Sequence, residues 1–110
     1  MSLQKDGHLL RVYINESDHY EHIPLYEWIL RKAQEKELAG ATVLRGMAGF
    51  IASDPIHTQK VLRLSDNLPV VIEIVDHLEK IETFLPILDK VIGEGLVTLE
   101  RVQVFLYRSR

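Results

Sequence analysis

One stretch without a secondary-structure period constrains the fold of this chain most. Ala41-Thr42-Val43-Leu44 has the composition of a strand, and another strand pattern opens at Leu68-Pro69. About fifteen residues between them follow neither a helical nor a strand period. Loops of this length are uncommon in compact domains and are usually functional or disordered. Gly46 and Gly49 stand at its start, where glycine permits positive φ angles and close approach of the backbone to a ligand. The sequence predicts a binding module whose moving part is this loop.

Composition narrows the class of protein. The chain has 110 residues, 46% hydrophobic and 26% charged, as in an ordinary soluble globular protein. This length predicts a single domain over residues 1–110, and we expect residues 1–7 to be disordered or expression-derived. The net charge of −3 argues against nucleic-acid binding, and the absence of cysteine excludes disulfides and thiolate metal sites. No apolar run approaches the roughly 20 residues of a membrane span, and we expect a cytoplasmic protein.

Two elements are predicted before the loop. Residues 8–15 alternate as a strand that places Leu10, Val12 and Ile14 on one face. Pro24 suits the first turn of a helix that we expect to continue to about Leu38. Gly40 follows it in the position of a C-terminal glycine.

Three further elements are predicted after the loop. Residues 69–75 form a nearly continuous apolar run, which is typical of an interior strand. Asp76 and Glu79 have the spacing of a capping box at the start of a second helix, which Pro86 should kink. The predicted apolar stripe of this helix is Leu78, Ile81, Leu85, Leu88 and Ile92. A short glycine turn at 93–95 leads to a last strand from Leu96 to Tyr107.

The order strand, helix, strand, long loop, strand, helix, strand predicts a ferredoxin-like α+β sandwich. We expect the first and third strands to be adjacent and parallel, with both helices on one face. Large apolar residues then gather on the other face, which implies a partner surface. They are Leu9, Tyr13, Val71, Val75, Phe105 and Tyr107, with Arg11 and Glu73 placed to pair among them. We therefore expect oligomerisation through the sheet.

The segments around the loop also carry a family resemblance. Residues 40–46, Gly49-Phe50, the long loop and residues 69–75 resemble the PII signalling proteins, and the glycine turn falls where that family has its second glycine loop. The pattern is more similar to the PII-like proteins called domain of unknown function 190. Leu25-Tyr26-Glu27 and the run from Leu68 to Asp76 are typical of that group. The similarity spans roughly residues 8–107.

The resemblance implies a PII-like homotrimeric regulatory protein. Its sheets would face inward, a small metabolite would bind in clefts between subunits, and the long loop would engage a transporter, channel or enzyme. The implied ligand residues are Arg45, Gly46, Gly49, Gly93, Glu94, Gly95 and Arg108, and the implied partner loop includes Asp54, His57 and Lys60. Leu96 stands where PII proteins have a phosphate-binding lysine, and Tyr107 and Ser109 replace their arginines. A triphosphate would lose charge-assisted contacts, so binding of ATP is not favoured.

Residue chemistry leaves several alternatives open. Arg45 would suit an anion at the mouth of the loop, but it is equally consistent with a solvated arginine at a strand end. The glycine turn would present N–H groups to an anion, or would simply form a tight turn. His19, Glu21, His22 and the lone loop histidine His57 do not form a convincing metal pattern.

No nucleophile and base, P-loop or dinucleotide fingerprint is recognisable. We therefore predict no catalytic residues, no metal and no cofactor. The rival hypotheses are an enzyme of the dimeric α+β barrel class and a metal-tolerance trimer of similar architecture.

Overall fold

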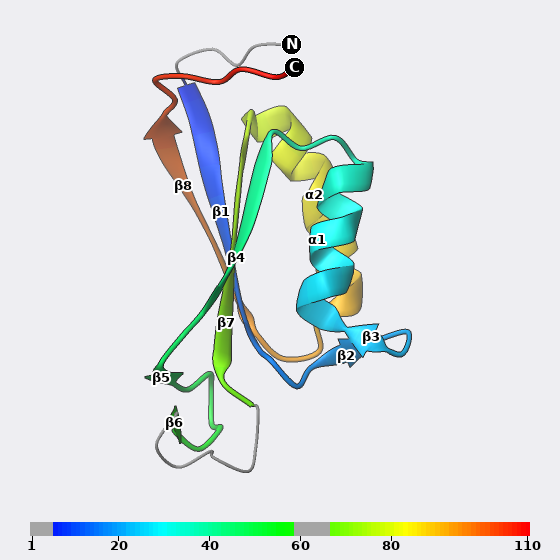
Figure 1. Cartoon of the computed structure of the whole chain (residues 1–110), viewed down its shortest axis with the longest axis vertical. Coiled ribbons are helices and arrows are strands. Elements are labelled where there is room, and N and C mark those ends of the chain that lie inside the picture. Colours follow the sequence, from blue (N-terminus) through cyan, green and yellow to red (C-terminus); the bar gives the residue numbers. More distant parts are fainter. Residues whose placement is uncertain (1–5, 59–66) are drawn as a thin grey trace.

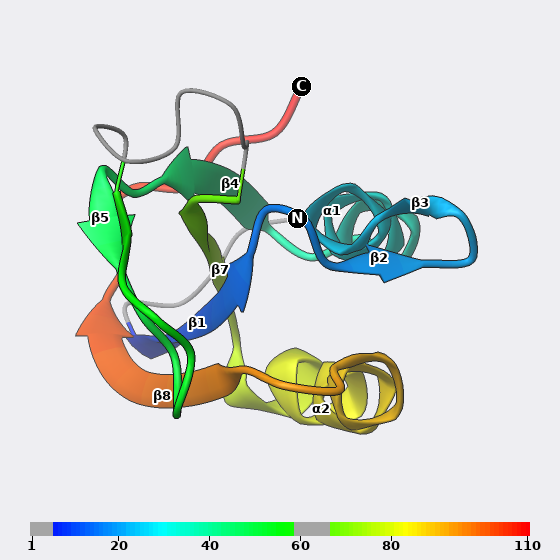
Figure 2. The same cartoon turned by 90° about the horizontal axis from the view of Figure 1, so that it is seen from below.

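The computed structural model describes residues 6–58 and 67–110, and it has two layers (Figure 1). One layer is a four-stranded sheet of β1 (Asp6–Asn15), β4 (Gly40–Arg45), β7 (Pro69–Asp76) and β8 (Leu96–Gln103). The other layer holds α1 (Leu25–Glu35) and α2 (Leu78–Val91), which cover one face of the sheet (Figure 2). Two short hairpins complete the elements, β2 (His19–Tyr20) with β3 (Ile23–Pro24) and β5 (Ala48–Gly49) with β6 (His57–Thr58). No helix in the described part is both long and apolar enough to cross a membrane.

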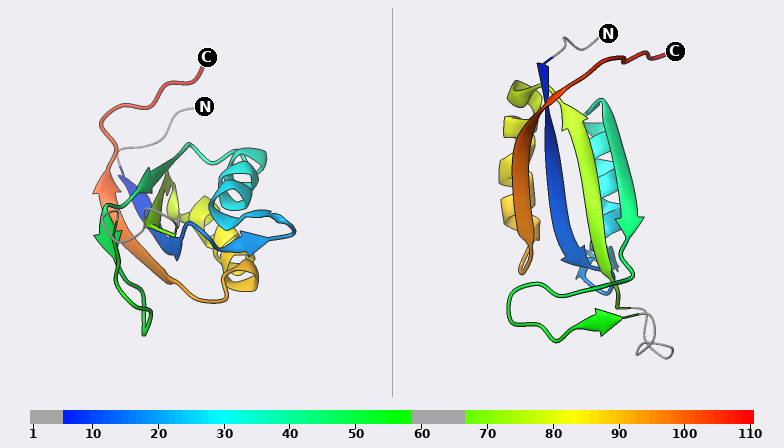
Figure 3. Two further views of the ribbon diagram at one scale, coloured as in Figure 1. Left: turned by 60° about the horizontal axis from the view of Figure 1, so that its bottom comes forward. Right: turned by 90° about the vertical axis from the view of Figure 1, so that its left-hand side faces the viewer.

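The sheet order is β4-β7-β1-β8, and each neighbouring pair is antiparallel. This order confirms the ferredoxin-like α+β sandwich. The expectation that the first and third strands are parallel is wrong, because β1 pairs antiparallel with β7, with Leu10 opposite Ile74. The helix α1 carries the chain from β1 back to a strand of the same direction, β4, and β7 is inserted between these two. A strand that pairs antiparallel with β4 must then oppose β1 as well (Figure 3).

The core lies between the sheet and the helices. Strand alternation places Leu10, Val12 and Ile14 of β1 beneath the helices, where all three are completely buried. The interior strand β7 contributes Ile72 and Ile74 in the same way. From the helices come Leu25, Ile29 and Ala33 of α1 and Ile81, Phe84, Leu88 and Val91 of α2. The alternation predicted for β1 and the interior position predicted for β7 are both confirmed.

The helix α1 ends earlier than the sequence predicts, at Glu35 and not near Leu38. Glu37 has φ of 59°, in the left-handed region. The Leu38 N–H donates to the Ala33 carbonyl at 3.0 Å and the Glu37 N–H to Gln34 at 2.9 Å. These two bonds are the Schellman arrangement that closes a helix. Gly40, predicted as the C-terminal glycine, instead opens β4.

The start of α2 also differs from the sequence prediction. The N-cap residue is His77, without a side-chain capping bond, so the predicted capping box at Asp76 is wrong. Asp76 is completely buried, and its carboxylate accepts the Ala39 N–H at 2.9 Å and the His77 N–H at 2.6 Å. It therefore joins the end of β7 to the segment that enters β4. The helix runs through Pro86 to Val91.

The two ends of the sheet depart from the expected boundaries. β1 begins at Asp6, so Asp6 and Gly7 belong to the sheet and not to a disordered start. β8 ends at Gln103, so the predicted extension of the last strand to Tyr107 is wrong. The first residue of β1 lies opposite Gln103, and the described chain offers no strand partner beyond it. Phe105 is 98% exposed, and residues 104–110 extend away from the sheet (Figure 3).

Candidate functional site

Arg45 ends β4 at the root of the long loop, and its partner comes from the end of β1. Its Nη2 and Nε lie 2.9 and 3.2 Å from the same Glu16 Oε1. The Arg45 side chain is still 52% exposed, so the pair leaves part of the guanidinium open to solvent. A shallow hollow surrounds it, lined by Glu16, Ser17, His19, Pro24, Tyr26, Arg45 and Asn67. This geometry suits the approach of a small anion to Arg45 from solvent.

The loop glycines have a packing role that the sequence did not reveal. The Gly46 N–H donates to the Pro69 carbonyl at 2.7 Å. A Cβ on Gly46 would lie 2.9 Å from Pro69 Cγ, and one on Gly49 would lie 3.2 Å from it. Neither glycine uses the positive φ that its residue type permits. The close approach that these glycines permit is to the first residue of β7, and it brings both ends of the loop together.

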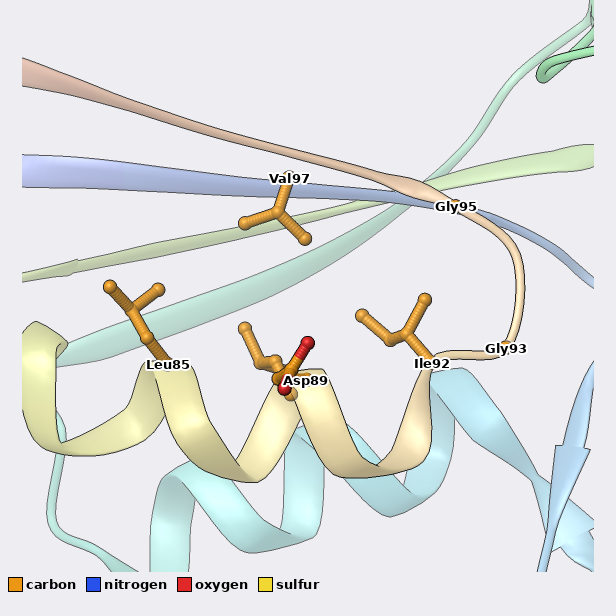
Figure 4. A pocket seen from close by; sticks show the side chains of 7 residues that line it. Leu85, Asp89, Ile92, Gly93, Gly95 and Val97 are labelled. Atoms are coloured by element: carbon orange, nitrogen blue, oxygen red, sulfur yellow. The ribbon is translucent and has the colours of Figure 1, made fainter.

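The glycine turn at 93–95 packs against β1. A Cβ on Gly95 would lie 2.8 Å from the Tyr13 carbonyl oxygen, whereas one on Gly93 would meet open space. Beside the turn is a pocket between α2 and the start of β8, where Leu85, Ile92 and Val97 converge (Figure 4). Asp89 is the charged residue among those that line it, and the walls are otherwise apolar or glycine. The pocket is therefore poorly suited to an anion.

Three acidic side chains from separate segments meet beside the glycine turn. The buried amide of Asn15 donates from Nδ2 to Asp54 Oδ2 at 3.0 Å, and the Asn15 backbone N–H donates to Asp18 Oδ2 at 3.0 Å. A hydrogen bond between Glu94 and Asp54 raises the pKa of Glu94, with further contributions from the Asp54 charge, burial and the Asp18 charge. Asp54 thus connects the long loop to both the end of β1 and the glycine turn.

The predicted ligand residues are only partly brought together within one chain. The end of β4 with Arg45, the strand β5 with Gly49, and the glycine turn before β8 lie at the same end of the sheet (Figure 1). Arg108 belongs to residues 104–110, which follow β8 and lie at the opposite end of the sheet (Figure 1). Of the predicted partner loop, Asp54 is described. His57 is placed in β6, but its side chain and all of Lys60 lie outside the described part of the chain.

The face of the sheet away from the helices carries the predicted interface residues of β1 and β7. Cross-strand pairs align Leu9 with Val75 and Tyr13 with Val71, and all four are half-buried. The predicted pairing of Arg11 with Glu73 is confirmed at 3.0 Å. Arg11 also contacts Glu100 of β8, and hydrogen bonds to Glu73 and Glu100 raise the pKa of Arg11 above its ordinary value.

On β8, the residues that share this open face are not those the sequence predicted. Val102 pairs with Gly7 and Leu96 with Tyr13, so both lie on the open face. Phe105 and Tyr107 were predicted there but lie beyond the end of the strand.

Asn15, Asp18 and Glu16 have roles that the sequence pattern does not indicate. Each acts through a contact with a residue far along the chain or through a backbone turn, and the local pattern around them is that of a polar loop. Within the described residues, no group of three His, Cys, Asp or Glu side chains is arranged to hold a metal ion.

Comparisons with solved structures show the class of fold. CPII, a nitrogen regulatory PII-like protein from Thiomonas intermedia K12 solved with ADP, AMP and bicarbonate, superposes with a TM-score of 0.62 at 16% identity. The match covers 90% of this chain and 88% of that one. A second CPII structure, bound to ADP and bicarbonate, gives a TM-score of 0.58 at 18% identity. The fold is that of the PII-like proteins, as the sequence resemblance implied.

Sequence comparisons then identify the family. The model of the DUF190 family, described as "Uncharacterized ACR, COG1993", matches residues 7–104. A UPF0166 protein from Aquifex aeolicus is 42% identical over 98 residues, covering 87% of this chain and 90% of that relative. A UPF0166 protein from Methanocaldococcus jannaschii is 35% identical over 98 residues, covering 88% and 90% respectively. The chain belongs to the DUF190 family.

Proposed function

We propose that this protein is a non-enzymatic, PII-like regulator that binds a small anionic metabolite between the subunits of a homotrimer. The long loop would transmit occupancy of that site to a protein partner such as a transporter or channel. Arg45 would supply the cation that holds the anion, and the backbone of the glycine turn would line the same cleft, with Arg108 contributed by a neighbouring subunit.

The observation that carries the proposal is the exposure and the hydrogen bonding of the Arg45 side chain. Its guanidinium is half exposed in a hollow at the loop root, and within the described residues its hydrogen bonds go to one carboxylate oxygen of Glu16. A guanidinium has five N–H donors in a planar fork, so donors remain for a second carboxylate, bicarbonate or phosphate group. An anion bound there would sit where β4 becomes the loop, and its presence would directly affect the loop conformation.

The fold likeness supports a small ligand, because CPII was solved with adenine nucleotides and bicarbonate. The open sheet face supports the trimer. Half-buried Leu9, Tyr13, Val71 and Val75 lie beside Leu44 and Leu96, which are 48% and 54% exposed. Large, partly exposed apolar residues gathered on an uncovered sheet face are uncommon on a monomeric protein.

Calorimetry of the purified protein tests the ligand site. Bicarbonate, AMP, ADP, cyclic nucleotides and ATP are titrated into the wild type and into Arg45→Ala. We expect one of the smaller anions to bind, and the variant to weaken it by about 1.5–3 kcal/mol, the scale of a hydrogen bond to a charged group. ATP should bind weakly or not at all, because Leu96 offers no cation for its phosphates.

The matched control is Arg31→Ala. Arg31 is also exposed and ion-paired, with Glu27 at 2.5 Å, but it lies on α1 outside the hollow. Its loss should leave binding unchanged. Equal weakening by both substitutions would indicate a general charge effect and would contradict a site at Arg45. Micromolar binding of ATP would contradict the importance given to Leu96.

A further inference from the structure

The hollow around Arg45 contains a histidine whose ring tautomer is fixed by the backbone. His19 of β2 lines this hollow, and its Nδ1 lies 2.6 Å from the Ser17 carbonyl oxygen. A carbonyl oxygen only accepts hydrogen bonds, so Nδ1 carries the proton and donates it. Nε2 of the neutral ring is then an acceptor. Within the described residues Nε2 has no hydrogen-bond partner, so it is available to a bound molecule.

Other acceptors line the same hollow. Arg45 donates from both Nε and Nη2 to Oε1 of Glu16, which leaves Oε2 of Glu16 as a second acceptor. The Ser17 hydroxyl donates its proton to Asn67 Oδ1 at 2.6 Å, so the Ser17 oxygen can only accept a further hydrogen bond. The hydroxyl of Tyr26 can act in either sense. Among the described residues that line the hollow, Arg45 is the charged donor and the acceptors lie around it.

A ligand that matches this hollow needs both a negative charge and a hydrogen-bond donor. Arg45 keeps N–H groups beyond the two that it gives to Glu16, and these suit a carboxylate-type anion. An anion without a proton to donate leaves Nε2 of His19 without a partner, and covering an unpaired acceptor costs free energy. An anion that also carries an O–H or N–H group can bind both residues. Bicarbonate is the smallest anion of this kind, and α-hydroxy carboxylates share its chemistry.

We propose that Arg45 and His19 form a two-point site that selects small anions carrying a hydrogen-bond donor. Arg45 binds the negative charge, and Nε2 of His19 accepts the hydrogen bond from the donor. The inference rests on the proposed function, because it specifies the class of ligand that the Arg45 site takes. His19 is therefore a specificity-determining residue, contributed by the hairpin that precedes α1 and not by the long loop.

NMR titration with two pairs of anions tests the selection, because the members of each pair differ in one donor. Bicarbonate is compared with nitrate, which has the same planar shape and charge but no proton, and glycolate is compared with acetate. The titrations are made at about pH 8, above the range in which an ordinary histidine takes up a proton. In the wild type, the donor-bearing anion of a pair should bind about tenfold more tightly, the factor that one hydrogen bond contributes. Selection in the first pair alone indicates bicarbonate, and selection in the second alone indicates a hydroxy carboxylate.

Three variants separate the two contacts. His19→Phe keeps a ring but removes both nitrogens, so it should abolish the selection within each pair while nitrate and acetate bind as before. Arg45→Ala should weaken all four anions. The matched control is His22→Asn, which removes a histidine of the same hairpin that does not line the hollow. Asparagine tolerates the φ of 71° at this position, so the control should keep the wild-type selection.

The ring tautomer of His19 is measured independently from its nitrogen signals, which should show a protonated Nδ1 and an unprotonated Nε2. A ring protonated at Nε2 would overturn the inference, as would equal affinities within both pairs or selection that survives His19→Phe. Absence of binding by both bicarbonate and glycolate would overturn it too. If Arg45→Ala weakened none of the anions, the proposed function itself would be contradicted, whatever the result for His19.

Discussion

At the end of α1, Glu37 holds a backbone conformation that favours glycine. Its φ of 59° lies in the left-handed region, which costs a residue with a Cβ roughly 1–2 kcal/mol. Glu37→Gly should raise the free energy of unfolding by about 0.5–1 kcal/mol, because the relief of this strain exceeds the added entropy of the unfolded chain. Urea denaturation measures the change. Glu35→Gly, within the last turn of the helix, should instead destabilise the protein by about 1 kcal/mol, and stabilisation by both would contradict the assignment to Glu37.

The end of α1 also determines which backbone group the buried Asp76 carboxylate binds. Since α1 closes at Glu37 and not at Gly40, the chain enters β4 through Leu38 and Ala39. The Ala39 N–H then points at the buried Asp76 carboxylate, which also accepts the His77 N–H. A carboxylate that accepts two backbone N–H groups is adequately satisfied in the interior. A residue that the sequence suggested as a helix cap therefore ties the start of β4 to the end of β7.

At the scale of elements, the contact with β1 limits which residue types the turn between α2 and β8 can hold. A Cβ at Gly95 would lie 2.8 Å from the Tyr13 carbonyl oxygen and 3.0 Å from Ile92 Cγ2. The first contact is with backbone and cannot be relieved by a rotamer change. Gly95→Ala should lower the free energy of unfolding by about 1–3 kcal/mol, the cost typical of overpacking.

Gly93 offers the control for that substitution. It lies two residues earlier in the same turn, and an added Cβ there meets open space. Thermal or urea denaturation of Gly93→Ala should therefore give a stability close to that of the wild type. Equal losses in the two variants would show that the turn requires glycine for its backbone conformation and not for its approach to Tyr13.

The elements that the sequence predicted well are those with a single period and an obvious face. β1 alternates cleanly, and β7 is apolar throughout because it is interior to the sheet. The helix α2 contains so many apolar residues that more than one apolar stripe is compatible with helical spacing. Leu78 was predicted to face the core but is 37% exposed, whereas the unpredicted Phe84 is completely buried. The alternation of apolar and polar residues continues after Gln103, but a strand needs a neighbour to pair with. The first residue of β1, Asp6, lies opposite Gln103, so β1 offers no partner to the residues that follow Gln103.

The candidate site was less predictable because its contacts join remote segments. Gly46 is a glycine because Pro69 approaches it, and Gly95 because Tyr13 does. Neither neighbour is visible in the local sequence, which therefore suggests that both glycines face a ligand. The sequence does point to Asp54 as a partner-loop residue and to Glu94 as a ligand residue. Their contact with each other follows only from the way the loop folds back on the turn.

At the scale of the whole molecule, the uncovered face of the sheet is the surface through which we propose that the subunits associate. The helices cover one face only (Figure 3). The other face carries apolar side chains from all four strands. Arg11 lies among them with its charge shared between Glu73 and Glu100. Since this arginine is already satisfied within one chain, the face can associate with another copy without leaving a cation unpaired.

The association of subunits gives the last prediction. Analytical ultracentrifugation at micromolar concentration should show the wild type as a trimer, and Val71→Glu should dissociate it, because Val71 lies on the open face opposite Tyr13 and Leu44. Burying an unpaired carboxylate costs about 3 kcal/mol or more, which weakens association over a hundredfold. Leu78→Glu is the control, since Leu78 is exposed in the helical layer at the start of α2, where an acidic residue is favourable. A monomeric wild type would contradict the use of this face. A dimer would favour the α+β barrel arrangement over the PII-like one.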